Sequence, residues 1–398
     1  MQKLLYLGFA FPPGVARSFA AVNPAGHQFE TEMLRALQQF FEIRCVTLIP
    51  REAAQAPRAD DHAEGIEPAL ILQEYKPEIP ARWRAVQQLQ EWFDRTTASG
   101  WIPDALLVYN LSPVYNRFVR SLQESNRRIP RILLLADSSS LGSRISPWKR
   151  FRRSLKPLYV SDGTAITWFD GCISLSPETR RFFEPRNVPW MWMPGGVSGE
   201  AADLDSAREG PISFGYFGAL APHSGILPFI KCFLRTSLPG PLHICGYGKL
   251  SEEIRKFRDP RLKFAGRLRS TNECLQFAMQ CDVLVNPRPP SHGNENNFPS
   301  KLFQYALTAR AILSSRLSGT EQVLGPAAFF FDPTEFEADL SEKLAIIGTA
   351  PRKELGQRGK AIRERVLHEY AWRRQAERIA QFISGLSFPA ASTAGSQD

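Results

Sequence analysis

Ser300, Lys301 and Gln304 have the types and the spacing of groups that could bind a diphosphate and a ribose together. They close a polar loop rich in asparagine, glycine and proline, inside the segment Asn286–Gly319. Pro299 favours a helix start here, because its missing N–H would have no partner in the first turn. A helix start offers free amides and a positive dipole end to anions, and Gln304 lies on the same face one turn further on. The same pattern also fits an ordinary capped helix with a solvated lysine.

Asp137 is a second candidate for chemistry, since it directly follows the apolar run Arg131–Ala136. A carboxylate at the end of a buried strand could act as a general base or could position a ligand. Because Asp-Ser-Ser-Ser is also favourable turn chemistry, a loop or helix cap is an equally good interpretation. The six cysteines and six histidines are scattered without metal-ligand spacing, which argues against a zinc ribbon or a disulfide framework.

The segment Ser146–Lys156 carries a cluster of positive charge. A serine and a proline favour a helix start, after which Trp148, Phe151 and Leu155 would share one face. The other face would hold cations and no acid, a pattern suited to an anionic membrane surface. A helix packed on its own domain with a solvated basic face fits about equally well, and no RNA-binding aromatic motif favours nucleic acid. The residues of this expected membrane contact are Trp148, Lys149, Arg150, Phe151, Arg152 and Arg153.

The elements that must position these groups alternate between short apolar runs and helical patterns along the 398 residues. Apolar residues make up 43% and charged residues 22%, which predicts a packed core. The sequence contains no run of 18 or more apolar residues, so no membrane span is predicted. Leu4–Phe11 is expected to form a buried first strand and not a signal peptide, because Pro12 and Pro13 stop it and no cleavage site follows. The net charge of +9 favours anionic partners.

Strand–helix alternation of this kind predicts mostly parallel sheets with helices on both faces. The expected strands are Leu4–Ala10, Arg44–Ile49, Ala105–Tyr109, Arg131–Ala136, Gly171–Leu175, Ile212–Tyr216, Leu242–Cys245, Leu262–Phe264, Val283–Asn286, Ala311–Ser314 and Ala328–Phe331. The expected helices are Gln28–Phe41, Trp83–Phe93, Val114–Leu122, Leu227–Leu234, Ser251–Phe257, Asn272–Met279, Ser300–Leu307 and a long final helix over about Arg352–Leu386.

The alternation is interrupted at Gly195–Gly210, which is rich in glycine and small residues and is the expected linker. It separates a first domain at 1–196 from a second domain at 211–365. The end of the final helix, residues 366–386, is expected to cross back onto the first domain, and residues 387–398 to form a disordered tail. Two doubly wound domains side by side leave a cleft between their carboxyl edges, where ligands bind.

The phrase FPSKLFQY, followed by AILSSRLSG, resembles the donor segment of retaining GT-B glycosyltransferases, especially family 4 (group 1). The resemblance implies a GT-B fold: α/β, with two Rossmann-like doubly wound domains facing across a cleft, the acceptor domain first and the donor domain second. Similar phrases precede it in the family's order: SFGYFGALAPHSGI at Ser213–Ile226, LHICGYG at Leu242–Gly248, LKFAGRL at Leu262–Leu268 and CDVLVNPR at Cys281–Arg288. More faintly, WFDGCISLS at Trp168–Ser176 and WMPGG at Trp192–Gly196 resemble the end of an acceptor domain.

The implied donor site departs from the family's pattern at several positions. The family's glutamate pair appears as Gln304 with Asn296 eight residues earlier, and Glu295 stands just out of register. The family's arginine and lysine on the diphosphate fall at Ala219 and Ser224, so Arg267, Arg288, Lys249 or Lys301 must supply the charge. The implied donor-binding residues are Gly218, Ser224, Gly246, Lys249, Arg267, Arg288, Ser300, Lys301 and Gln304.

On the acceptor side, the family's frequent His-Asp pair appears as Ala136-Asp137, and Asp137 is the implied catalytic residue. It would be the general base of an inverting enzyme, or would position the sugar in a retaining one. The loop after the first strand often holds acceptor contacts in this fold, so Gly14, Arg17 and His27 are implied acceptor-side residues. For His27, the position also fits a polar residue at a helix start.

The resemblance implies transfer of a sugar from a nucleotide diphosphate sugar to a saccharide or lipid-linked saccharide, in surface polysaccharide or glycan assembly. The nucleotide sugar is a co-substrate, and no cofactor or metal is expected, because arginine and lysine can stabilise the leaving diphosphate. The expected location is the cytoplasm, peripherally at the inner face of an anionic membrane, and nucleic acid is not an expected partner. The alternatives are a catalytically silent GT-B scaffold or partner subunit of a transferase, and a nucleotide-sugar epimerase.

Overall fold

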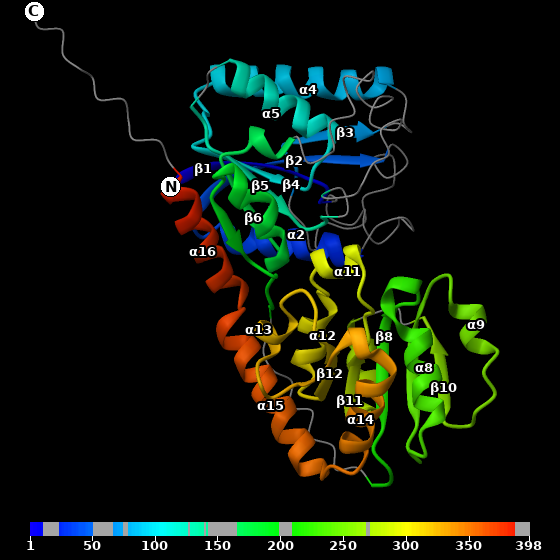
Figure 1. Ribbon diagram of the computed structural model, residues 1–398. Helices are drawn as coiled ribbons and strands as arrows, with labels where there is room; N and C mark the ends of the chain where they lie inside the picture. Colours follow the sequence, from blue (N-terminus) through cyan, green and yellow to red (C-terminus); the bar gives the residue numbers. More distant parts are fainter. Residues whose placement is uncertain are drawn as a thin grey trace, which may run out of the picture. The chain divides into compact units, whose positions relative to one another are not determined.

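The computed structural model describes residues 1–10, 24–50, 67–74, 79–125, 128–138, 141, 165–198, 209–267 and 271–386 (Figure 1). These residues form two compact units. The first contains the described residues of Met1–Leu175 and Thr179–Met193, together with Trp372–Leu386. The second contains Ser176–Glu178 and the described residues of Pro194–Ala371.

The first unit is built on a parallel sheet of seven strands in the order β3-β2-β1-β4-β5-β6-β7. Every residue of the central strands β4 and β5 is buried, as expected for parallel strands covered on both faces. Because the chain runs outward from β1 to β3 and then returns to β4, the strand order reverses between β1 and β4. The strands are β1 (Gln2–Gly8), β2 (Phe41–Pro50), β3 (Leu70–Glu74), β4 (Ala105–Tyr109), β5 (Arg131–Leu135), β6 (Gly171–Ser174) and β7 (Trp190–Trp192).

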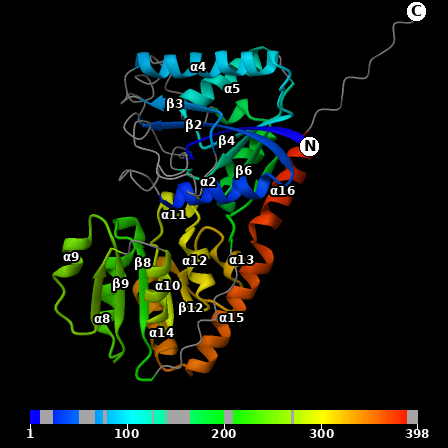
Figure 2. The same ribbon diagram turned by 180° about the vertical axis from the view of Figure 1, so that it is seen from behind.

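Helices cover both faces of this sheet. In Figures 1 and 2, α4 (Ile79–Ala98) and α5 (Pro113–Glu124) lie on one face, with α2 (Pro24–Leu37) and α16 (Trp372–Gly385) on the other. Phe93 and Phe118 meet edge to face between α4 and α5, with ring centroids 5.3 Å apart. On the other face, the Trp372 indole nitrogen donates to the Glu32 carboxylate at 2.6 Å, which fixes α16 on α2. The short helix α7 (Arg180–Phe183) follows β6.

The second unit has a parallel sheet of six strands in the order β10-β9-β8-β11-β12-β13. The order reverses between β8 and β11, because the chain returns from the edge strand β10 to pair β11 with the opposite side of β8. The strands are β8 (Phe214–Ala219), β9 (Leu242–Tyr247), β10 (Leu262–Gly266), β11 (Val283–Asn286), β12 (Ala311–Ser315) and β13 (Phe329–Phe331).

The helices of the second unit also form two layers around the sheet. The buried core on one face takes its side chains from α8, α9 and α14, and on the other face Phe217 packs against Phe277 of α10 and Tyr305 of α12. The helices are α8 (Ile226–Arg235), α9 (Ser251–Arg255), α10 (Thr271–Met279), α11 (His292–Asn296), α12 (Lys301–Leu307), α13 (Thr320–Leu324), α14 (Phe336–Gly348) and α15 (Arg352–Glu369).

The prediction of a single long helix over Arg352–Leu386 is wrong. The segment forms two helices, α15 and α16. The break lies at Tyr370 and Ala371, where Ala371 forms a β-bridge with Val197. Within α15, Gly359 allows close packing, since a Cβ there would lie 2.1 Å from the Ala309 carbonyl oxygen. The expected linker at Gly195–Gly210 is described only at its ends, and residues 387–398 lie outside the described residues.

Candidate functional site

The second unit brings several candidate residues together where its strand order reverses. Ligands of open parallel sheets bind beyond the carboxyl ends of the strands at such a reversal. Gly218 lies near the end of β8, Arg288 lies two residues after β11, and Lys301 begins α12. The backbone pairing between β8 and β11 covers only Phe214 and Gly215 of β8.

Further along β8, where β11 no longer pairs with it, Tyr305 of α12 forms the hydrogen bonds that a neighbouring strand would form. Its hydroxyl accepts from the Phe217 amide at 3.1 Å and donates to the Phe217 carbonyl at 2.8 Å. These are the two backbone groups that would otherwise face an absent continuation of β11. The rings of Phe217 and Tyr305 also pack together, with centroids 4.5 Å apart.

The loop after β8 is fixed against the segment after β11. Gly225 has a positive φ of 70°, and a Cβ there would lie 1.6 Å from the Pro287 carbonyl oxygen, so only glycine fits this approach. The Asn294 side-chain amide donates to the His223 carbonyl at 2.9 Å and to the Pro289 carbonyl at 2.8 Å, which joins the two segments. These contacts therefore hold the backbone of the segment with His223 against the backbone of the segment with Arg288.

Lys301 and Arg288 form the electrostatic centre of this site. The Lys301 ammonium lies over the Tyr216 ring, 4.0 Å from its centroid. Removal of the ammonium from water, together with repulsion by Arg288, holds the Lys301 pKa well below its usual value. Burial likewise lowers the pKa of Arg288 to about 10, and its guanidinium donates to the Asn297 carbonyl at 2.7 Å. Burial also raises the pKa of Tyr216 to about 12, so this ring is a neutral phenol.

The positive charge of this pair has no compensating carboxylate among the residues that the structure describes. Two half-buried cations that repel each other cost free energy in the empty protein, and an anion bound between them would remove that cost. Perturbed pKa values of this kind are typical of functional sites. The pair is therefore suited to a small, multiply charged anion such as a diphosphate.

The other predicted donor residues near this pair, Gly218, Ser224, Ser300 and Gln304, carry no charge. At Gly218 an added Cβ would be in ordinary contact with the Lys301 side chain at 3.5 Å, so glycine is favoured there by its positive φ of 144° and not by lack of space. The Ser224 hydroxyl is used locally and donates to the Ala221 carbonyl at 2.7 Å. Ser300 caps α12 without a side-chain cap bond, and Ser300 and Gln304 are exposed. Because α12 has only seven residues, its dipole adds little to the two cations.

The remaining predicted donor residues lie at the ends of β9 and β10. Gly246 has a structural role, since a Cβ there would lie 2.0 Å from the Gly218 carbonyl oxygen. Lys249 and Arg267 are exposed, and the Arg267 guanidinium stacks on the exposed Tyr247 ring at 4.6 Å. Neither of these two cations is among the causes that lower the pKa of Lys301 or Arg288.

The first unit places Asp137 near its own strand reversal. Asn110, which follows β4 and has a positive φ of 58°, accepts from the amides of Ala136 and Asp137 at 2.8 Å each. The Asp137 side chain is exposed after β5, and His27 is half-buried in the first turn of α2. Burial lowers the pKa of the His27 imidazole, so it is neutral at pH 7. Gly14, Arg17 and the basic segment with Trp148–Arg153 lie outside the described residues.

A buried carboxyl group that the sequence did not suggest lies beside the end of β1. Glu30 is 2% exposed and accepts from the Tyr6 hydroxyl at 2.7 Å and from the Phe9 amide at 2.9 Å. Burial raises its pKa to about 7, although the hydrogen bonds act in the opposite direction. Together with Thr47, whose hydroxyl donates to the Ala10 carbonyl at 2.6 Å, Glu30 fixes residues 9 and 10.

We expect Glu30 to make the stability of the first unit depend on pH. The folded protein binds the Glu30 proton more tightly than the unfolded chain, so the free energy of unfolding falls as pH rises from about 4.5 to about 7. The expected loss is on the order of 3 kcal/mol. Urea denaturation at several pH values should show this slope in the wild-type protein and not in Glu30→Gln. The exposed Glu124→Gln is the control, and an unchanged slope in Glu30→Gln would contradict the assignment.

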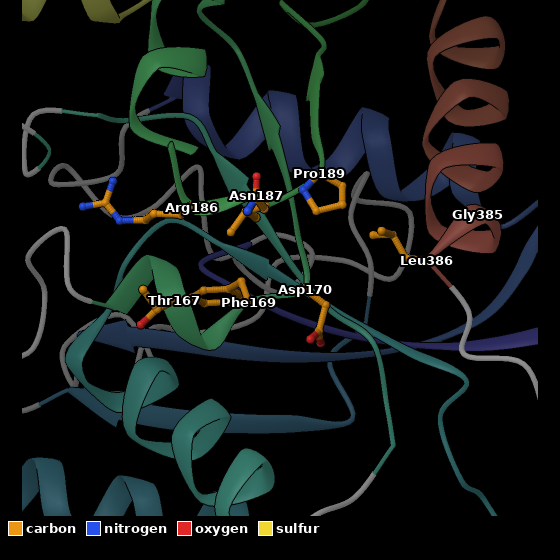
Figure 3. Close-up of a pocket in the computed structure, with 9 residues that line it drawn as sticks. Thr167, Phe169, Asp170, Arg186, Asn187, Pro189, Gly385 and Leu386 are labelled. Atoms are coloured by element: carbon orange, nitrogen blue, oxygen red, sulfur yellow. The ribbon is translucent and has the colours of Figure 1, made fainter. Parts of the chain in front are cut away.

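An open pocket of about 460 Å³ lies elsewhere in the first unit (Figure 3). Asp170, Asn187 and Pro189 line it beside the end of α16, next to the amino ends of β6 and β7. The Asp170 carboxylate already forms a two-pronged ion pair with Arg131, at 2.7 and 2.8 Å. Because ligands of parallel sheets bind at the opposite, carboxyl edge, we assign the pocket no role in the site.

Comparisons with known proteins agree with this topology at the level of the fold. No protein-family profile matches the chain, and neither does any curated protein sequence. The lipopolysaccharide outer core galactosyltransferase WaaB is similar, with TM-score 0.66 and 14% identity over 96% of this chain and 100% of its own. Sucrose-phosphate synthase from Thermosynechococcus elongatus is similar with TM-score 0.66 and 14% identity, over 97% of this chain and 99% of its own.

The Anabaena protein HepE in complex with UDP-glucose is also similar, with TM-score 0.61 and 15% identity over 97% of this chain and 100% of its own. At these identities the likeness shows the fold. The chain therefore has the GT-B fold, with its two α/β units, as the sequence resemblance predicted. Membership of family 4 stays a prediction.

Proposed function

We propose that the protein is a glycosyltransferase that moves a sugar from a nucleotide diphosphate sugar to a saccharide acceptor. The observation that carries this proposal is the Arg288–Lys301 pair at the strand reversal of the second unit, in a chain with the GT-B fold. Nucleotide diphosphates match the site because their two phosphates carry adjacent negative charges. Support for the donor class also comes from the similar protein HepE, whose solved complexes contain UDP and UDP-glucose.

The chemistry proposed for the pair is stabilisation of the leaving group. When the bond between the sugar and the diphosphate breaks, negative charge develops on the phosphate oxygen that departs. Cations that are already positioned and partly removed from water stabilise this charge without reorganisation. Gln304 would hydrogen-bond a ribose hydroxyl, and Asp137 would act on the acceptor or position the sugar.

Calorimetric titration with UDP, GDP and related nucleotide sugars tests this proposal. We expect one nucleotide to bind at a single site, and its affinity to fall as salt is added, because charges recognise the diphosphate. The absence of binding by every nucleotide tested would overturn the donor assignment. Transfer to saccharide acceptors can then be followed by product analysis with the nucleotide sugar that binds.

A catalytically silent GT-B protein is the second candidate. Gln304 and Ala219 stand where the family has charged residues, and the structure shows that the Ser224 hydroxyl is bound within its own loop. Such a protein could bind a nucleotide sugar without transferring its sugar. Donor hydrolysis or transfer that disappears in Lys301→Ala would exclude this candidate.

We further propose that the acceptor is lipid-linked and that the protein works at the inner face of a membrane, in surface polysaccharide assembly. Among the described residues, no helix combines the length and the apolar character needed to span a bilayer. The proposed contact is the basic segment Ser146–Lys156, on the strength of its sequence pattern. Reversing the charges of Arg152 and Arg153 to glutamate should weaken binding to anionic liposomes in sedimentation assays, and unchanged binding would contradict the proposal.

A further inference from the structure

We propose that His223 is a further residue of the donor site, and that its imidazole binds the donor diphosphate and takes up a proton as it does so. The inference rests on the proposed function, because it concerns the same anionic ligand. His223 lies in the loop Pro222–Ser224, directly after β8, and its side chain is exposed.

The geometry of the loop places His223 beside the two cations. The loop lies close against the segment after β11, since a Cβ at Gly225 would meet the Pro287 carbonyl, and Asn294 joins the His223 and Pro289 carbonyls through two hydrogen bonds. This arrangement uses the His223 carbonyl and leaves the imidazole without a hydrogen-bond partner among the described residues. Within that part of the chain, the charged groups that act on the ring are Arg288 and Lys301. Both neighbours are positively charged, and no carboxylate in the described part of the chain acts on the ring.

These surroundings give the imidazole a different charge in the empty and the occupied site. In the empty protein, partial removal of the imidazole from water and then repulsion by Arg288 and Lys301 lower the His223 pKa, so the ring is neutral at pH 7. A diphosphate bound to the same cations brings two negative charges, which reverse the sign of the local field and favour the imidazolium. Binding of the donor should therefore be accompanied by uptake of a proton by His223.

In this role, His223 would also supply positive charge that the loop after β8 otherwise lacks. The family's arginine and lysine would stand at Ala219 and Ser224, and neither residue here can carry charge. His223 is the neighbour of Ser224, and it can become positive when an anion is present. Unlike a lysine, a neutral histidine adds no third repulsive charge to Arg288 and Lys301 in the empty protein.

Calorimetry with a nucleotide sugar tests the proposal, using UDP-glucose first and otherwise the tightest-binding nucleotide sugar of the panel. The diphosphate of a nucleotide sugar is esterified at both ends, so it does not itself titrate near neutral pH. Titrations at about pH 6.5 in two buffers of different ionisation enthalpy give the number of protons taken up. We expect uptake of up to about one proton in the wild-type protein and none in His223→Gln.

The matched control is His368→Gln on α15, which should keep the wild-type uptake. At about pH 6 the affinity of His223→Gln should be about 10-fold lower or more, and near pH 8 the difference should shrink. As an independent measurement, the imidazole NMR signal that is missing in His223→Gln should titrate at higher pH in the bound wild-type protein than in the free protein.

The outcomes separate the two proposals. Binding with the same proton uptake in wild type and His223→Gln, or with no uptake in the wild type, overturns the role of His223 and leaves the donor site standing. If no nucleotide sugar binds to the wild-type protein, the proposed function fails and the role of His223 fails with it.

Discussion

Replacing Lys301 with methionine should lower the affinity for the nucleotide sugar by about 100-fold or more, while the empty protein becomes no less stable. The loss of affinity follows because the ammonium is one of the two cations that would face the proposed diphosphate, in a place where charge is poorly screened by water. The stability of the empty protein should not fall, because the change removes a desolvated charge and its repulsion from Arg288. Methionine is of similar length and would place an uncharged group where the ammonium lies over the Tyr216 ring.

Two measurements check this expectation: calorimetry for affinity, and urea denaturation of the empty protein for stability. Lys353→Met, on the exposed side of α15, is the control and should change neither quantity appreciably. A Lys301→Met protein that is several kcal/mol less stable would show that the lysine supports the fold. Unchanged affinity would show that the diphosphate lies elsewhere.

Gly225→Ala should destabilise the second unit by about 3 kcal/mol or more and should also weaken nucleotide binding. The added Cβ would lie 1.6 Å from a backbone oxygen, and the residue must also keep a left-handed φ of 70°. Relief requires the loop after β8 to move away from Pro287, which would separate His223 from Arg288. One substitution should therefore reduce stability and binding together, in contrast to Lys301→Met.

Gly356→Ala is the control for this glycine, since a Cβ there meets nothing within 4 Å and the residue lies inside α15. It should stabilise the protein by about 0.5–1 kcal/mol, because alanine favours a helix more than glycine does. Urea denaturation followed by fluorescence and by circular dichroism would measure both variants. A Gly225→Ala protein with wild-type stability would mean that the loop is free to relax.

The fold was largely predictable because the strongest sequence signals belong to central strands. Ala105–Tyr109 and Val283–Asn286 have in the structure the bounds that their apolar runs predicted. The missed strands β3 and β7 are edge strands of the first sheet, and β7 has only three residues. Edge strands are short and half exposed, so they lack the continuous apolar run that marks a buried parallel strand.

The sequence predicted the kind of residues in the candidate site, but not which of the candidate cations lie close together. Arg288 and Lys301 were already among the four expected cations, yet local sequence could not separate them from Lys249 and Arg267. The choice depends on which loops meet where the strand order reverses. Tyr216 lies within an apolar strand, where an aromatic residue is expected to be core. Glu30 lies in an amphipathic helix, and its burial depends on the packing of that helix over β1.

Tyr305 has a consequence for how a ligand would be received. Its hydroxyl satisfies the backbone groups of Phe217 on the side where β11 no longer pairs, so β8 and β11 can part without leaving a buried amide unbonded. Because Tyr305 supplies these hydrogen bonds, β8 and β11 are already separated at this point in the empty protein. A nucleotide entering there would not need to break a sheet or order a loop, and the entropy lost on binding would fall mainly on the ligand itself.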